Sequence, residues 1–189
     1  MERSCRLTDH YLPPGEGFVL ESLVATTYQV DFEFFEEELL AAALGVRSSV
    51  SRLKAFRSEL ERRLQKVEVS VLYDLAGCDK FARLSPRIDA IPVVARKLHS
   101  KISLLMWVRE DRVGGAAPDR RMRLIVGSAN LTRQGFRQNY ECVVSMDYGG
   151  KNSARRSLLN AAIELVQQIG AEYRIRDASR VGLRMLSRA

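Results

Sequence analysis

The sequence predicts an α/β protein with a mixed, largely buried β-sheet flanked by helices. Three observations carry this prediction. Apolar, β-branched segments alternate along the chain with helical patterns, hydrophobic residues make up 46% of the sequence, and charged residues make up 28%. Alternating strands and helices usually form a sheet that is covered by helices. The chain has 189 residues, enough to bury one sizeable core without disulfide or metal support.

The first half is expected to contain two strands and two helices. In chain order these are a buried strand over residues 23–28, a helix over 32–44, a helix over 50–65 and a strand over 67–73. Asp31 is a suitable N-cap for the first helix, and Gly45 is a suitable stop.

The second half is expected to contain more strands and a closing helix. These are strands over 91–94, 98–108, 123–126 and 140–146, and a helix that begins after Asn152 or Ser153. Its expected apolar stripe is Leu158, Ala162, Leu165, Val166 and Ile169. Residues 109–122 carry Gly114, Gly115 and Pro118 and are expected to form a mobile loop. We expect residues 1–150 to form the main domain, with C-terminal helices in 151–189 packed on it.

Composition excludes several classes of protein. No segment has the roughly 18 uncharged apolar residues of a spanning helix, and the first residues lack the apolar core of a signal peptide. The three cysteines, Cys5, Cys78 and Cys142, include no C-x-x-C pair, and the chain has two histidines. This set argues against a zinc site and fits a reducing cytoplasm, so neither metal nor cofactor is expected.

The net charge of +7 is unevenly distributed. Residues 1–95 hold 12 basic and 15 acidic side chains, a net charge of −3, whereas residues 96–189 hold 18 and 8, a net charge of +10. A basic half of this kind suggests a polyanionic partner, nucleic acid before an anionic membrane. An arginine-rich solvated surface explains the composition equally well.

Two polar side chains interrupt the apolar segment 98–108. His99 and Lys101 are two residues apart, so in a strand they project from the same face while Ser100 points away. A strand buried on both faces does not hold such groups without compensation. Taken alone, the pattern is explained more simply by a strand end at His99 and a lysine that reaches solvent.

A second motif follows the strand predicted over residues 123–126. Gly127-Ser128-Ala129-Asn130 offers backbone amides, a hydroxyl and a carboxamide to an anion, and the glycine permits close approach. Taken alone, this motif is explained more simply by a turn before a short capped helix.

Together, His99-x-Lys101 and Gly127-Ser128-x-Asn130 resemble the signature of the phospholipase D-like (HKD) superfamily, and Glu141 matches an acidic residue of many single-motif members. The resemblance covers residues 18–148 and implies an α/β/α sandwich fold and metal-independent phosphodiester cleavage. It further implies that His99 attacks phosphorus, that Lys101 and Asn130 hold the nonbridging oxygens with help from Ser128, and that Glu141 orients a histidine. Gly127, Thr132 and Arg133 complete the substrate-binding set that we expect.

The chain departs from the family pattern in three ways. Met106 stands where the motif has an aspartate. Several nuclease-type members also lack that aspartate, so Met106 indicates that branch of the family more than a loss of activity. The segment between Lys101 and Gly127 is longer than usual. The other histidine, His10, belongs to no second H-x-K motif. Because two motifs normally build one site, we expect either a homodimer that pairs two His99 residues or a second HKD half in a longer chain.

The leading functional hypothesis is a nuclease that cleaves DNA through backbone contacts. Seven arginines near the motifs in sequence favour it: Arg109, Arg112, Arg120, Arg121, Arg123, Arg133 and Arg137. Two alternatives stay open: a catalytically silent DNA-binding or dimerisation module, and a phospholipase D or phosphatidyl transferase. No membrane partner is expected, because no amphipathic segment with exposed aromatic residues lies near the motifs.

Overall fold

The computed structural model confirms an α/β protein built on one mixed sheet. It describes residues 6–78, 85–94, 97–109, 117–150 and 153–172. The strands are β1 (Val19–Thr27), β2 (Glu68–Asp74), β3 (Ile88–Val93), β4 (Ile102–Arg109), β5 (Asp119–Gly127) and β6 (Val143–Tyr148). Their order is β3-β2-β1-β4-β5-β6. β1, β2 and β3 are parallel, and the pairs β1–β4, β4–β5 and β5–β6 are antiparallel.

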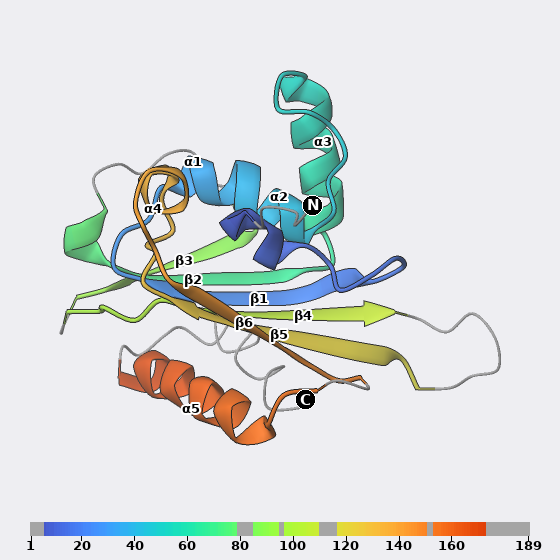
Figure 1. The fold of residues 1–189 in the computed structure, drawn as a ribbon. Helices are drawn as coiled ribbons and strands as arrows, with labels where there is room; N and C mark the ends of the chain where they lie inside the picture. Colours follow the sequence, from blue (N-terminus) through green and yellow to red (C-terminus); the bar gives the residue numbers. More distant parts are fainter. Residues whose placement is uncertain (1–5, 79–84, 95–96, 110–116, 151–152, 173–189) are drawn as a thin grey trace.

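Helices cover both faces of this sheet (Figure 1). One face carries the 3-10 helix η1 (Leu7–Tyr11), α3 (Leu53–Leu64) and α4 (Arg133–Arg137). It also carries one continuous helical segment, made of α1 (Phe32–Phe34), η2 (Phe35–Leu40) and α2 (Ala41–Ala43). The other carries α5 (Arg156–Glu172). The short 3-10 turn η3 (Leu75–Gly77) follows β2. The result is the three-layer sandwich expected from the sequence.

The first helical segment begins and ends where the sequence predicts. The Asp31 carboxylate accepts a hydrogen bond from the Phe34 amide at 3.0 Å, which satisfies a free donor at the helix start. Gly45 has a φ of 64°, a left-handed conformation that glycine adopts without strain and that ends the helix. The π-helical turn of η2 was not predicted, because the hydrophobic pattern does not distinguish it from an α-helix.

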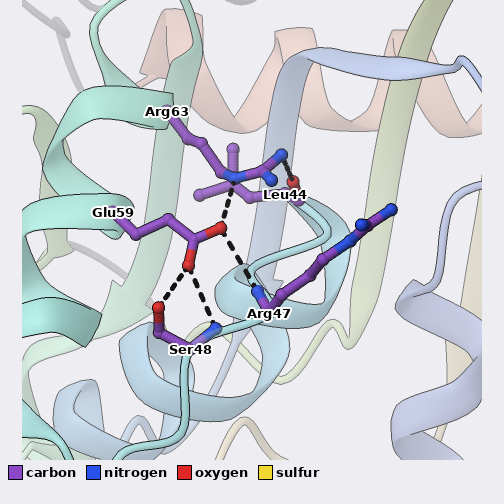
Figure 2. A network of polar contacts seen from close by, with 5 residues as sticks. All are labelled: Leu44, Arg47, Ser48, Glu59 and Arg63. Atoms are coloured by element: carbon purple, nitrogen blue, oxygen red, sulfur yellow. Dashed lines mark hydrogen bonds and ion pairs between the residues drawn. The ribbon is translucent and has the colours of Figure 1, made fainter.

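A polar network attaches α3 to the end of the first helical segment (Figure 2). The Glu59 carboxylate accepts hydrogen bonds from the Ser48 hydroxyl at 2.6 Å and from the amides of Arg47 and Ser48 at 3.3 and 3.0 Å. Arg63 binds Glu59 at 3.1 Å and also donates to the Leu44 carbonyl at 2.8 Å. The Ser48 hydroxyl contributes most to lowering the pKa of Glu59, which falls to about 2.

The core on the other face lies between the sheet and α5. Leu159, Ala162 and Val166 are buried against Met122 and Tyr148, among others. The predicted stripe is therefore wrong at two positions, since Leu158 and Leu165 are exposed. The buried residues follow the spacing of three and four that one helix face requires, and Leu158 lies beside that face.

Several strand boundaries differ from the predictions because strand pairing, not local composition, sets them. β5 begins at Asp119, inside the predicted loop, because it pairs with β4 as far as Arg109, and those two residues form an ion pair at 3.2 Å. β6 begins at Val143, not at residue 140. The helix α5 begins at Arg156, later than expected.

Part of these predictions falls outside the described residues, namely residues 110–116 of the predicted loop and residues 173–189 of the C-terminal segment. None of the helices in the described part of the chain is long and apolar enough to span a membrane.

Candidate functional site

Both sequence motifs and Glu141 lie at one end of the sheet. Lys101 directly precedes β4, Gly127 ends β5, and Glu141 lies two residues before β6. Because the three strands are antiparallel neighbours, Ile102 pairs with Val126 and Val126 pairs with Val144. This pairing places the His99–Lys101 segment, the Gly127–Asn130 turn and the Glu141 segment side by side.

His99 and Lys101 lie next to each other, but not within a strand. β4 begins at Ile102, so the prediction of a strand from Leu98 is wrong. Lys101 Nζ lies 3.2 Å from His99 Nδ1 and 3.4 Å from Nε2, and it also donates to the His99 carbonyl at 3.3 Å. An ammonium group has only protons to donate, so in this contact the imidazole is the acceptor. Ser100 instead binds Thr26, at 3.0 Å.

The charge state of Lys101 depends on its surroundings. Partial burial lowers the pKa of Lys101, and the nearby Glu141 carboxylate partly opposes this shift. Lys101 therefore combines partial desolvation with a carboxylate that helps it keep its proton. A lysine in this state can contact an anion at less desolvation cost than one taken from bulk water.

The Gly127–Asn130 turn is held against the two neighbouring segments by its backbone. The Gly127 amide donates to the Lys101 carbonyl at 3.2 Å, and the Ser128 amide donates to the Cys142 carbonyl at 3.0 Å. A Cβ atom on Gly127 would lie 2.7 Å from that Cys142 carbonyl oxygen. Glycine is thus required here for the close approach of two backbones, the role that the motif suggests.

Asn130 is oriented by the segment that follows β1. Its Oδ1 accepts hydrogen bonds from the Gln29 amide at 3.2 Å and the Thr27 hydroxyl at 3.4 Å. Its Nδ2 is 3.4 Å from the Gln29 side-chain oxygen, a long contact to an exposed residue. The oxygen of the carboxamide is therefore used inside the fold, and the NH₂ group remains the donor that can turn to a ligand.

Glu141 contacts the second motif and not His99. It accepts a short hydrogen bond from the Ser128 hydroxyl and a second one from Asn139 Nδ2 at 3.2 Å. The Ser128 hydroxyl in turn accepts from the Cys142 amide at 3.0 Å. Within the described residues of this single chain, no hydrogen bond joins Glu141 to His99. The predicted orienting contact is therefore not made inside one chain.

Thr132 and Arg133, predicted to bind substrate, have partners within the fold. The Thr132 hydroxyl caps α4 by accepting from the Gly135 amide at 3.0 Å. Arg133 pairs with Glu38 at 3.1 Å, and Arg137 pairs with the other oxygen of the same carboxylate. Glu37 is also close enough to Arg133 for the two charges to interact, so acidic side chains surround these arginines.

The other arginines near the motifs in sequence are separated from them in space. β4 runs away from the site, so Arg109, Arg120 and Arg121 lie at the opposite end of the sheet, a strand length of roughly 25 Å. They pair with Asp119 or Glu21. Arg123 is largely buried and binds Asp147 and two backbone carbonyls, and Arg112 lies outside the described residues. The inferred arginine cluster is thus reduced to Arg133 and Arg137.

His10 does not complete the site as the second histidine. Its Nδ1 lies 2.8 Å from the Ser145 hydroxyl, which belongs to β6. With His99 as the only other histidine in the sequence, this chain offers one imidazole at the site. Among the described residues, no group of three or more potential ligands could hold a metal ion.

Sequence reasoning missed three residues that surround His99. The Tyr28 ring lies 5.5 Å from the His99 ring, and Lys97 Nζ lies 5.3 Å from the same tyrosine ring. The Asp74 carboxylate accepts from the Leu98 amide at 2.8 Å and thereby fixes the backbone before His99. Tyr28 and Asp74 stand at the carboxyl ends of two predicted strands, which the structure shows to be parallel neighbours. Ligand sites are common at this position, and that signal could have identified both residues.

No protein-family model matches the chain, and a search of curated proteins finds no similar sequence. The resemblance to the phospholipase D-like superfamily therefore depends on the two motifs, on Glu141 and on their arrangement at one end of the sheet.

Proposed function

We propose that the chain is one half of a metal-independent nuclease that cleaves DNA through a covalent phosphohistidine. One observation carries the proposal. His99 and Lys101 lie in contact at the same end of the sheet as the Gly127–Asn130 turn and Glu141. An imidazole, an ammonium group and a carboxamide donor are the groups that attack on a phosphodiester requires.

The chemistry divides into two displacements at phosphorus. In the first, the unprotonated nitrogen of His99 forms a bond to phosphorus, and the bond between phosphorus and the leaving oxygen breaks. Lys101 and the Asn130 NH₂ group donate to the nonbridging oxygens, whose negative charge increases during attack. A second histidine gives its proton to the leaving oxygen. It then takes a proton from the water that cleaves the phosphorus–nitrogen bond and restores His99.

A second copy of the chain is the proposed source of that second histidine. Exposed apolar side chains surround the site: Val126 and Val144 pair across β5 and β6, and Tyr140 directly precedes Glu141. Such a patch is typical of an interface between protein chains. A two-fold axis beside it would bring two His99 residues to one phosphate and would give Glu141 a partner imidazole. A second HKD half in a longer chain remains the alternative.

The departure at Met106 does not favour a silent binding module. Met106 is buried on β4 among Leu104, Met122 and Leu124, on the face covered by α5. Its side chain belongs to the core and not to the site. The absence of an aspartate at this position therefore leaves the groups around His99 unchanged.

The nuclease proposal is tested with plasmid DNA in the presence of EDTA. Wild-type protein is expected to cleave the plasmid, and His99→Ala is expected to lose activity by roughly 10⁴-fold or more because the nucleophile is gone. A labelled oligonucleotide should become covalently attached to wild-type protein only, through a bond that acid breaks and alkali does not. Equal cleavage by His99→Ala, or no cleavage by wild type of either the plasmid or single-stranded DNA, contradicts the proposal.

The dimer is tested separately, with one valine and one leucine of equal exposure. Val144 and Leu158 are each 53% exposed, on β6 and on α5. Val144→Glu is expected to give a monomer by solution mass and to lose activity, whereas Leu158→Glu is the matched control and should change neither. A wild-type protein that is a monomer yet active would contradict the shared site.

A further inference from the structure

A groove lies beside His99, at the carboxyl ends of the parallel strands. It has a volume of about 580 Å³, and its lining includes Tyr28 after β1, Leu75 after β2 and Val94 after β3. Lys97 lies at its margin. Grooves of a few hundred cubic ångströms are the size that a small ligand such as a nucleoside fills.

One residue, Tyr28, both lines the groove and lies next to His99. The Tyr28 ring that lines the groove is 5.5 Å from the His99 ring. Asp74, which also lines the groove, accepts a hydrogen bond from the Leu98 amide and so fixes the backbone before His99. A substrate whose phosphorus lies at His99 would therefore extend directly into this groove.

The chemistry of the walls suits a planar, uncharged ring beside an anion. Leu75 and Val94 are 44% and 69% exposed, so apolar surface faces the groove, next to the aromatic ring of Tyr28. The negative charge of Asp74 is largely buried, since its two oxygens accept from the amides of Ala76 at 2.9 Å and Leu98 at 2.8 Å. Lys97 then supplies an accessible cation for a phosphate next to the ring.

We propose that this groove binds an unpaired nucleoside next to the scissile phosphate, so that the substrate is single-stranded nucleic acid. The inference rests on the proposed nuclease function and specifies its substrate. Aromatic side chains stack on single-stranded bases of any identity. A base in a duplex is stacked and paired, so it enters such a groove only after flipping out, which costs a few kcal/mol. An acyl chain is the competing occupant of an apolar groove, but it gives neither Tyr28 nor Lys97 a specific partner.

The first experiment compares three substrates in EDTA: an oligonucleotide, its duplex of the same sequence, and a single strand of the same length built from stable abasic sites, which has the same diesters but no bases. Wild-type kcat/KM is expected to be at least about tenfold higher for the single strand than for the duplex, because the duplex must first release a base. An equal or higher value for the duplex overturns the groove proposal. If none of the three is cleaved, the proposed function itself fails.

The second experiment places a negative charge in the groove. Val94→Glu is expected to lower kcat/KM for the single strand about tenfold more than for the abasic strand, because the two carry the same charges and only the strand with bases fills the groove. Leu158→Glu, a comparable exposed position on α5, is the matched control. Equal effects of Val94→Glu on both substrates overturn the proposal. Cleavage of phosphatidylcholine vesicles that Val94→Glu abolishes, with the single strand unaffected, also overturns it and assigns the groove to an acyl chain.

Discussion

Two serine–glutamate pairs in this protein have the same local chemistry and different surroundings. Ser48 donates to Glu59 and Ser128 donates to Glu141. The Glu59 carboxylate also receives two backbone amides and the Arg63 guanidinium (Figure 2). The only other hydrogen bond given to Glu141 within the described residues comes from Asn139.

The difference lies in how fully each carboxylate is satisfied. Every strong hydrogen-bonding direction of Glu59 is used to join α3 to the preceding helical segment, so this carboxylate stabilises the fold. Glu141 is half-buried near Lys101 and retains acceptor capacity. An acid with unused capacity beside a partly buried lysine is the pattern of a functional site. Four predictions test this distinction.

The largest expected effect is on activity, from Glu141→Gln. We expect kcat/KM for diester cleavage to fall by roughly 100-fold, with little change in the free energy of unfolding, because the carboxylate supports the reacting groups and not the core. Glu141 raises the pKa of Lys101, so its removal lowers that pKa further. The basic limb of the pH–rate profile should then move to lower pH. An unchanged profile with a large loss of stability would make Glu141 a structural residue.

Glu59→Gln is expected to lower the stability of the fold and to leave cleavage unchanged. It removes a charged acceptor of four hydrogen bonds and should lower the free energy of unfolding by about 2 kcal/mol, measured by urea denaturation. Cleavage by the folded variant should equal that of wild type. A loss of activity without loss of stability would contradict the assignment of this network to the fold.

The stabilisation by Glu59 should disappear in acid. Its pKa is about 2 in the folded protein, lowered from an ordinary value of 4.5. The stabilisation is therefore complete above about pH 4.5 and is lost as the pH falls toward 2, where the folded state also takes up the proton. The stability difference between wild type and Glu59→Gln should shrink over this range. A difference that stays constant to pH 2 would show that charge is not the cause.

The smallest effect is expected from Ser48→Ala. The variant loses one hydrogen bond to Glu59 while Arg63 and two amides remain, so we expect a loss of about 1 kcal/mol in the free energy of unfolding. Ser49→Ala is the matched control, since Ser49 is exposed and, among the described residues, its hydroxyl bonds only with the Ser51 side chain and amide. Equal losses of unfolding free energy in the two variants would contradict a stabilising role for the Ser48–Glu59 hydrogen bond.

Local chemistry made part of this molecule predictable. The N-cap Asp31 and the left-handed Gly45 set the ends of a helix through interactions with nearby residues, and the sequence displays both. The two motifs could be placed together for a related reason. The first motif stands at the start of one apolar segment, and the second motif follows the next one. Antiparallel neighbours place the start of one strand beside the finish of the other, so the two motifs lie at the same end of the sheet.

What could not be predicted depends on contacts between distant segments. β5 extends back to Asp119 because β4 offers partners as far as Arg109. The same pairing carries Arg109, Arg120 and Arg121 away from His99, although they are close to the motifs in sequence. The groove beside Tyr28 is formed by the ends of three strands, and no short segment of the sequence contains it.

The close approach at Gly127 has a consequence for how this protein tolerates mutation. Any side chain at this position would press the Cys142 carbonyl and the Val143 side chain, at 2.7 and 2.8 Å from the new Cβ atom. The segments that carry Ser128 and Glu141 would move apart, while the core beneath them stayed intact. In a saturation library sorted for folded protein, substitutions at residue 127 should therefore survive far more often than in the same library sorted for cleavage.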